Sequence, residues 1–171
     1  MDRKILFIIA GVLLFVVLVF YGWRWIFSAP PPKSPEELAQ IALTASTPQE
    51  QEKAAVELAP LGHSAVEPMV RVLSESRSPE VRAVMIQGLA VERDFDSMPA
   101  FLNALDDESV LVRTRAAGAV QRLLQIDVGY RADAPREKRL EKIKVFREDW
   151  EKMRVTPGLR KFREKLRQQG Q

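Results

Sequence analysis

Two stretches of sequence decide the fold: VRAVMIQGLA at residues 81–90 and VRTRAAGAVQ at residues 112–121. They align at an offset of 31 residues, with Val-Arg at the start of each and small or apolar residues at the matching later positions. Upstream of them, PMV at residues 68–70 and PAF at residues 99–101 align at the same offset. A unit of about 20 to 45 residues that repeats in this way is typical of a solenoid built from stacked elements.

Within each unit the apolar residues have the spacing of an amphipathic helix. In residues 66–73 and 98–105 they recur at i, i+3, i+4 and i+7. A weaker copy at residues 51–59, offset by 30, has Glu52 where the other two units have arginine. Because an isolated helix pair cannot bury its apolar stripe, we expect an all-α fold with three stacked helix pairs over residues 34–127.

Helix-start signals recur along the chain. Each has serine or threonine at the N-cap, followed by proline at the first helical position, by glutamate three residues after the cap, or by both. The predicted N-caps are Ser34, Thr47, Ser64, Ser78 and Thr156.

The Pro-x-apolar pattern at Pro68 and Pro99 and the Val-Arg-x-x-small pattern at Arg82 and Arg113 resemble the HEAT-repeat family, including its phycobilin-lyase-type members. The resemblance covers residues 34–127 and implies a short α-solenoid. It also implies a binding or scaffold module, with partner contacts along the concave face made by side chains of the second helix of each pair.

Three arginines are candidate structural or partner-contact residues of the repeats: Arg82, Arg113 and Arg115. The resemblance implies that such arginines bridge to acidic residues of the adjacent repeat. A ladder of guanidinium groups that binds phosphate is the alternative role.

The sequence offers few groups for catalysis or metal binding. It has no cysteine and one histidine, which excludes a thiolate nucleophile and a sulfur-ligated metal. Asp106-Asp107-Glu108 could form a cation site, but acidic residues at a helix start and in a solvated turn account better for this run. We therefore expect no catalytic residue, no cofactor and no metal.

The N-terminal segment has the composition of a membrane span. Residues 5–22 carry no charge, and a stretch of about 20 apolar residues crosses a bilayer core. We predict an uncleaved transmembrane signal-anchor at residues 1–28, with lipid contact through residues 5–27. A cleaved signal peptide is the alternative, and bulky Phe27 and Pro30 fit poorly beside its candidate cleavage site.

A short proline-rich tether follows at residues 29–33, where three consecutive prolines impose extended geometry. Arg3 and Lys4 precede the predicted span, and Glu36 and Glu37 follow soon after it. This bias predicts a cytoplasmic N-terminus and a domain on the extracytoplasmic or periplasmic side.

Residues 128–171 are predicted to form a loop and a basic amphipathic helix, with the helix at residues 136–154. The loop at residues 129–135 resembles the tails of HEAT-repeat proteins from planctomycete-type bacteria. On the helix, Phe146 and Trp150 either seal the last solenoid layer or form a partner hot spot.

Charge is distributed unevenly along the chain, whose formal net charge is +3. Residues 33–135 carry 10 basic and 16 acidic side chains, whereas residues 136–171 carry 13 basic and 6 acidic ones. The basic segment predicts weak contact with anionic lipid, without nucleic-acid binding.

Together these features predict a membrane-tethered scaffold that binds a protein partner at the membrane surface and has no catalytic activity. One alternative function is a HEAT-like chromophore lyase. The other is an envelope or membrane-surface assembly subunit that uses the basic tail.

Overall fold

The computed structural model of the 171-residue chain describes residues 15, 17, 19, 32–92, 95–127 and 129–159. These residues form helices, turns and loops, and no β-strand occurs among them. The predicted all-α class is therefore confirmed for the described part of the chain. The chain divides into two compact units, Met1–Lys33 and Ser34–Gln171.

The first unit contains the predicted membrane anchor. Apart from Phe15, Val17 and Val19, which are helical and exposed, residues 5–27 lie outside the described residues. No helix among the described residues is long and apolar enough to cross a bilayer. The membrane anchor and its tether therefore remain predictions.

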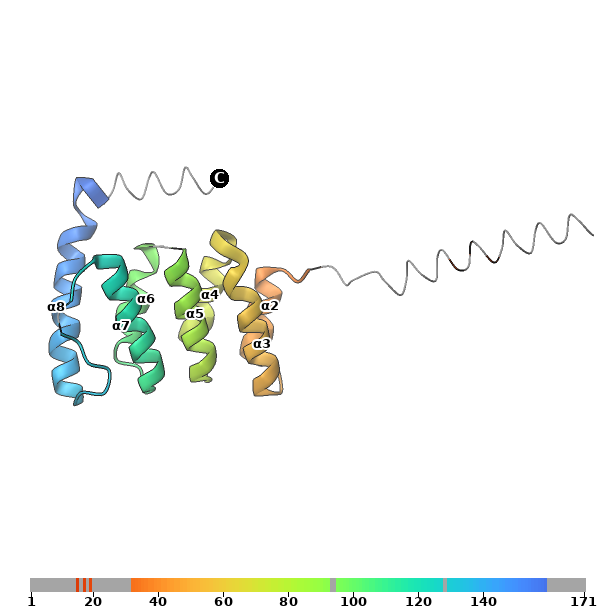
Figure 1. Cartoon of the computed structure of the whole chain (residues 1–171), viewed down its shortest axis with the longest axis horizontal. Coiled ribbons are helices and arrows are strands. Elements are labelled where there is room, and N and C mark those ends of the chain that lie inside the picture. Colours follow the sequence, from red (N-terminus) through yellow and green to blue (C-terminus); the bar gives the residue numbers. More distant parts are fainter. Residues whose placement is uncertain are drawn as a thin grey trace, which may run out of the picture. The chain divides into compact units, whose positions relative to one another are not determined.

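The second unit begins with three helix pairs (Figure 1). The pairs are α2 (Pro35–Thr44) with α3 (Pro48–Leu58), α4 (Val66–Glu75) with α5 (Pro79–Val91), and α6 (Met98–Ala104) with α7 (Val110–Leu124). The second helices contact one another in the order α3, α5, α7, and the first helices in the order α2, α4, α6. This two-layered stack is the arrangement that the 31-residue offset predicts.

Side-chain caps set the starts of three helices. Ser34, Thr47 and Ser78 accept hydrogen bonds from the backbone N–H groups of Glu37, Glu50 and Val81. Each N-cap is followed by proline, whose fixed φ suits the first helical position. These three predicted starts are confirmed.

The predicted N-cap at Ser64 is wrong. Residues 59–65 form a 3-10 segment, η1, in which Gly62 has a φ of 73°, and α4 begins at Val66. The Ser64 hydroxyl donates to the Leu61 carbonyl at 3.2 Å instead of accepting from a helix N–H. The kink at Gly62 moves the helix start beyond the serine.

After the third pair, the chain forms a loop and then α8 (Arg136–Arg154), which has the predicted bounds. Helix α8 contacts α6 and thus extends the layer of first helices. Trp150 on α8 stacks on Phe95 of the short helix η2 (Phe95–Ser97), with ring centroids 6.4 Å apart. Phe146 packs against Tyr130 of the loop at the same centroid distance. Phe146 and Trp150 therefore lie inside the last layer.

Two helical glycines differ in how closely other atoms approach them. A Cβ atom added to Gly88 on α5 would lie 2.7 Å from Met69 Sδ and 3.1 Å from both the Cβ and the carbonyl oxygen of Ala59. A Cβ atom added to Gly118 on α7 would have nothing within 4 Å. Close packing of α5 on α4 and η1 thus requires glycine at 88, whereas no atom packs as closely on Gly118 of α7.

We therefore predict opposite effects of the same substitution at these positions. Gly88→Leu should lower the free energy of unfolding by about 1–3 kcal/mol, because it overpacks the contact with Met69 and Ala59. Gly118→Leu should leave it unchanged or raise it by up to about 1 kcal/mol, because leucine is the better helix former. Urea unfolding of both variants measures the difference, and equal losses would contradict this account.

Candidate functional site

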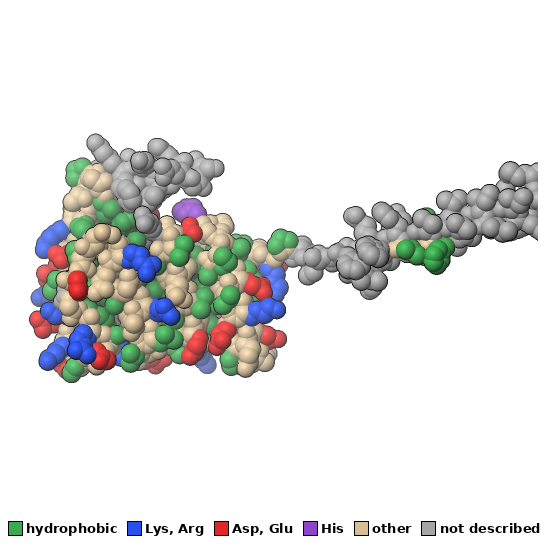
Figure 2. Space-filling model, viewed as in Figure 1, with side chains coloured by type: hydrophobic (Ala, Val, Ile, Leu, Met, Phe, Trp, Pro, Cys, Tyr) green, Lys and Arg blue, Asp and Glu red, His purple; other side chains and the backbone are tan. Residues whose placement is uncertain are grey.

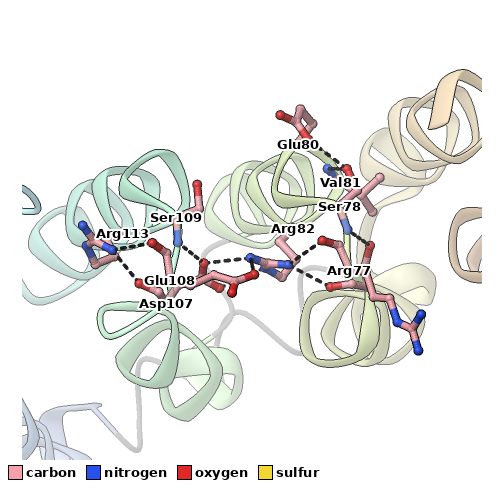
Figure 3. Close-up of polar contacts among 10 residues, drawn as sticks. Arg77, Ser78, Glu80, Val81, Arg82, Asp107, Glu108, Ser109 and Arg113 are labelled. Atoms are coloured by element: carbon pink, nitrogen blue, oxygen red, sulfur yellow. Dashed lines mark hydrogen bonds and ion pairs between the residues drawn. The ribbon is translucent and has the colours of Figure 1, made fainter.

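A buried guanidinium near the start of α5 joins two repeats. Arg82 Nε and Nη2 donate to the two carboxylate oxygens of Asp107 at 2.9 and 2.8 Å, and Nη2 lies 3.4 Å from Glu108 Oε1. Arg82 Nη1 donates to the carbonyls of Ser76 and Arg77 at 2.9 and 3.1 Å (Figure 3). The Arg82 side chain is 8% exposed. The predicted bridge from this arginine to an acidic residue of the next repeat is therefore present.

The equivalent arginine of the third pair, Arg113, makes a related set of contacts. Its Nη1 donates to the carbonyls of Asp107 and Glu108 at 2.7 and 2.9 Å, in the loop of its own repeat (Figure 3). Its Nε donates to the Ala132 carbonyl at 2.7 Å, in the loop that precedes α8. Among the described residues no carboxylate forms an ion pair with Arg113, so its partners beyond the repeat are backbone atoms.

The first pair has a glutamine at this position. Gln51 precedes Arg82 by 31 residues, and its Nε2 donates to the Ala45 carbonyl at 2.9 Å, the equivalent of the Ser76 carbonyl. The predicted replacement of the arginine by Glu52 is thus wrong by one residue, and Glu52 is exposed. The N-caps Thr47 and Ser78 are also 31 residues apart, which places all three pairs in one register.

Asp107 combines two roles in the loop between α6 and α7. Its Oδ1 accepts the backbone N–H of Ser109 at 2.8 Å, as the hydroxyl of Ser76 accepts that of Ser78 at 3.2 Å one repeat earlier. The loop contact therefore needs only an oxygen, whereas the bridge to Arg82 needs the carboxylate. Burial alone lowers the pKa of Arg82, but the hydrogen bonds and charge of Asp107, with Glu108, outweigh it and raise the pKa above its usual value.

The neighbouring carboxylate, Asp106, holds the start of α8. Arg136 Nη2 and Arg139 Nη2 donate to it at 2.6 and 3.2 Å. The hydrogen bond from Arg136 lowers the pKa of Asp106 more than burial raises it, and Arg139 lowers it further. Asp106 and Asp107 are therefore bound by arginines, and among the described residues no group of three or more His, Cys, Asp or Glu side chains could hold a metal ion.

Arg115 differs from the other two candidate arginines. It lies on α7 with its side chain exposed, and it makes no ion pair with any described residue. The structure thus does not bring the five candidate residues together. Arg82 and Arg113 bind loops, Phe146 and Trp150 are buried, and Arg115 alone of the five faces solvent.

The outward side of the second helices forms a surface whose residues the sequence patterns did not identify, although the HEAT resemblance places partner contacts on side chains of these helices. Equivalent exposed or half-buried positions recur on α3, α5 and α7 at 31-residue intervals, as with Val56, Gln87 and Gly118. We call this surface the second-helix face and define it by Lys53, Val56, Val84, Gln87, Val91, Leu111, Arg115 and Gly118. Figure 2, viewed from the side of α3, α5 and α7, shows hydrophobic side chains among uncharged atoms, with basic side chains inside this face and other charged groups toward its margins. In the sequence, the second-helix face could have been identified from the repeat positions that lie opposite the buried apolar stripe of each second helix.

A groove of about 720 Å³ opens between α4 and α6. Its lining includes Leu73, Pro99, Asn103 and the Arg82–Asp107 pair. Each of the five N–H donors of Arg82 already has an acceptor. The arginine therefore forms part of the wall and is not a free cation for a ligand.

The stacked helix pairs and their repeated arginines define an α-solenoid of short repeats. Residues 98–126 match the family model of the HEAT repeat, and this segment contains α6 and α7. The match supports a likeness to HEAT repeats for this helix pair. A search of curated proteins and a search of solved structures each found no match. The likenesses to phycobilin-lyase-type and planctomycete-type proteins remain predictions.

We predict that Arg82 and Asp107 are energetically coupled. Arg82→Met and Asp107→Leu should each lower the free energy of unfolding by about 3–5 kcal/mol, because each leaves a buried charge without its partner. The double variant should cost clearly less than the two single variants together, and urea unfolding of all four proteins measures the difference. Arg115→Met, which removes an exposed arginine, is the matched control and should change stability by less than about 0.5 kcal/mol. Strict additivity would contradict a direct bridge.

We also predict a pH dependence from Asp106. Because its pKa is lower in the folded chain, the ionised carboxylate stabilises the fold above its ordinary pKa of about 3.9, and this contribution is lost as pH falls through the lowered value. Asp106→Asn should therefore destabilise the protein at neutral pH, and the difference from wild type should shrink on acidification. Urea unfolding measured from neutral pH down to acidic pH tests this prediction. Glu141→Gln, on the exposed surface of α8, is the control. A loss that stays constant with pH would contradict the assignment.

Proposed function

We propose that this protein is a membrane-tethered HEAT-repeat module that binds a protein partner at the membrane surface and catalyses no reaction. HEAT repeats commonly mediate protein–protein interaction and scaffolding. The proposal of a membrane tether is supported by the charge-free run at residues 5–22 and the prolines at residues 30–32. Arg3 and Lys4, which precede the run, favour an extracytoplasmic domain.

The observation that carries the binding role is the exposure of apolar side chains on the second-helix face. Val56, Val91 and Leu111 are 59%, 73% and 41% exposed on three successive helices of one layer. Beside them Arg115 is exposed without an ion-pair partner among the described residues. Protein interfaces combine apolar area with a few polar anchors, among which arginine is enriched. A partner that covers this face would gain from apolar burial and from pairing with Arg115.

The charges of α8 give less support to an assembly role through the basic segment. Three of its cations pair with carboxylates of the same helix, in Lys144–Glu148, Lys152–Asp149 and Arg154–Glu151. Arg136 and Arg139 are bound to Asp106. Much of the basic charge in the described part of this segment is therefore neutralised locally, which favours the second-helix face as the partner site.

We predict that charge introduced on the second-helix face will reduce partner capture. The full-length protein is expressed in its native host and cross-linked in intact membranes. It is then purified, and the captured proteins are identified. Val91→Asp should reduce capture of the cross-linked partner by about tenfold or more, because it places a carboxylate in an apolar contact. Val155→Asp, beyond the end of α8 at similar exposure, is the matched control and should leave capture unchanged.

Three outcomes would each contradict one part of the proposed function. Equal capture by the wild type, Val91→Asp and Val155→Asp would remove the second-helix face as the binding site. Recovery of the full-length protein in the soluble fraction would remove the membrane tether. Turnover of a substrate by the purified protein would contradict the proposal that it has no catalytic activity.

A further inference from the structure

The repeat register shows that one side of α7 lacks the neighbour that α5 has. On α5, which packs against α7, Ala83, Ile86 and Ala90 are 5%, 1% and 6% exposed. The equivalent residues of α7, 31 positions later, are Thr114, Ala117 and Gln121. Thr114 is exposed and Gln121 is half-buried, so this side of α7 is only partly covered.

Within the described residues the chain does not place a second helix beside α7. The loop at residues 129–135 passes there, and α8 joins the first-helix layer next to α6 (Figure 1). A groove of about 440 Å³ remains between α7 and this loop. Its lining includes Val110, Thr114, Ala117, Gly118, Tyr130 and Ala132. The groove has room for side chains from one face of a helix that packs on α7.

The floor of the groove is suited to close approach by such a helix. Ala117 and Gly118 lie side by side in it, and nothing occupies the space within 4 Å of a Cβ at Gly118. On α5, glycine at 88 likewise permits close contact with Met69 of α4 and Ala59 of η1. Small residues of this kind let two helices approach until their backbones are nearly in contact.

The charges beside the groove favour an acidic occupant. Arg131 and Asp133 on its rim pair with each other at 3.1 Å, and Asp127 accepts from Gln121. Arg115 and Arg122 are exposed on α7 and form no ion pair with any described residue. These two cations are seven residues apart, so they lie on one side of the helix. They remain available to carboxylates of a bound helix.

The basic C-terminal segment is a poorer match for the same groove. Residues 160–171 contain five basic side chains and one acidic side chain, and thus repeat the sign of Arg115 and Arg122. A helix with carboxylates along one edge would instead neutralise both cations.

We propose that the groove beside α7 receives the apolar face of an acidic amphipathic helix from a partner protein. The partner helix packs on α7 as α7 packs on α5, and its carboxylates pair with Arg115 and Arg122. This inference rests on the proposed protein-binding function, and it adds the chemistry of the partner and extends the binding surface from Arg115 and Gly118 of the second-helix face to the edge of the stack.

The experiment measures binding of synthetic helices to the full-length protein by fluorescence anisotropy. Two peptides of about 15 residues, a length at which isolated helices become stable, share leucines at i, i+3, i+4 and i+7. One has glutamates along the edge of its apolar face, and the other has lysines there. The glutamate peptide should bind at least about tenfold more tightly than the lysine peptide.

Two leucine variants test the location of the binding site. Gly118→Leu fills the groove and should weaken binding of the glutamate peptide by about tenfold or more. Gln87→Leu adds a leucine at the equivalent position of α5, away from the groove, and should leave binding within about twofold. Arg115→Glu with Arg122→Glu should reverse the preference between the two peptides. Urea unfolding of each variant confirms that the fold is retained.

Three results would overturn the inference: no binding of the glutamate peptide, equal binding of the lysine peptide, or full binding to Gly118→Leu. Occupation by the protein's own basic segment would also overturn it. Because the natural chain has no cysteine, Gly118→Cys with Phe162→Cys introduces a single thiol pair, and an intrachain disulfide between them would reveal such occupation.

The proposed function is tested separately by Val91→Asp, which lies on the second-helix face and outside the groove. If the glutamate peptide does not bind while Val91→Asp still reduces partner capture, the groove is not the binding site but the proposed function stands. If Val91→Asp does not change partner capture while the glutamate peptide binds the groove, only the second-helix face is excluded as the partner site.

Discussion

The stack of repeats depends on keeping a buried guanidinium fully hydrogen-bonded. Arginine stays charged at any physiological pH and carries five N–H donors, so its burial is tolerated only where acceptors surround it. For Arg82 these acceptors are two carbonyls in the loop of its own repeat and carboxylate oxygens in the next loop. If either loop moved, several donors would lose their partners together. The arginine therefore fixes the position of one repeat relative to the next, which is the role best attested for buried ion pairs.

The same interaction changes along the chain in a way that explains both ends of the stack. Among the described residues Gln51 binds the loop of its own repeat, through the Ala45 carbonyl. Arg82 binds its own loop and a carboxylate of the next. Arg113 binds its own loop and the Ala132 carbonyl, where the repeat pattern gives way to the loop before α8. Two further contacts complete this last attachment. Asp106 pairs with two arginines of α8, and the Tyr130 hydroxyl donates to the Leu105 carbonyl.

Sequence periodicity predicted the parts of the fold that are determined within a single repeat. The 31-residue offset identified the helix pairs, and the apolar spacing at residues 136–154 gave the bounds of α8. The errors occurred where local patterns compete with tertiary geometry. Ser64 resembles an N-cap, but Gly62 turns the chain and shifts the helix start to Val66. Glu52 aligns at an offset of 30 only because the first unit retains too few matching residues to fix its register.

The candidate site was predictable to a lesser extent. The likeness to HEAT repeats anticipated that Arg82 reaches an acidic residue of the next repeat, and Asp107 is that residue. The likeness did not distinguish Arg113, which binds loops, from Arg115, which faces solvent. Side chains two positions apart on a helix point to nearly opposite sides, and the likeness did not indicate which side is buried. The likeness placed partner contacts on the second helices, but the exposed residues of these helices and the vacancy beside α7 could not be predicted, since both depend on where neighbouring repeats pack. In a solenoid each repeat contacts only its neighbours, so a side that is core in one repeat becomes surface where the next second helix is missing. Ala83 and Thr114 illustrate this, because they share a repeat position yet differ in burial.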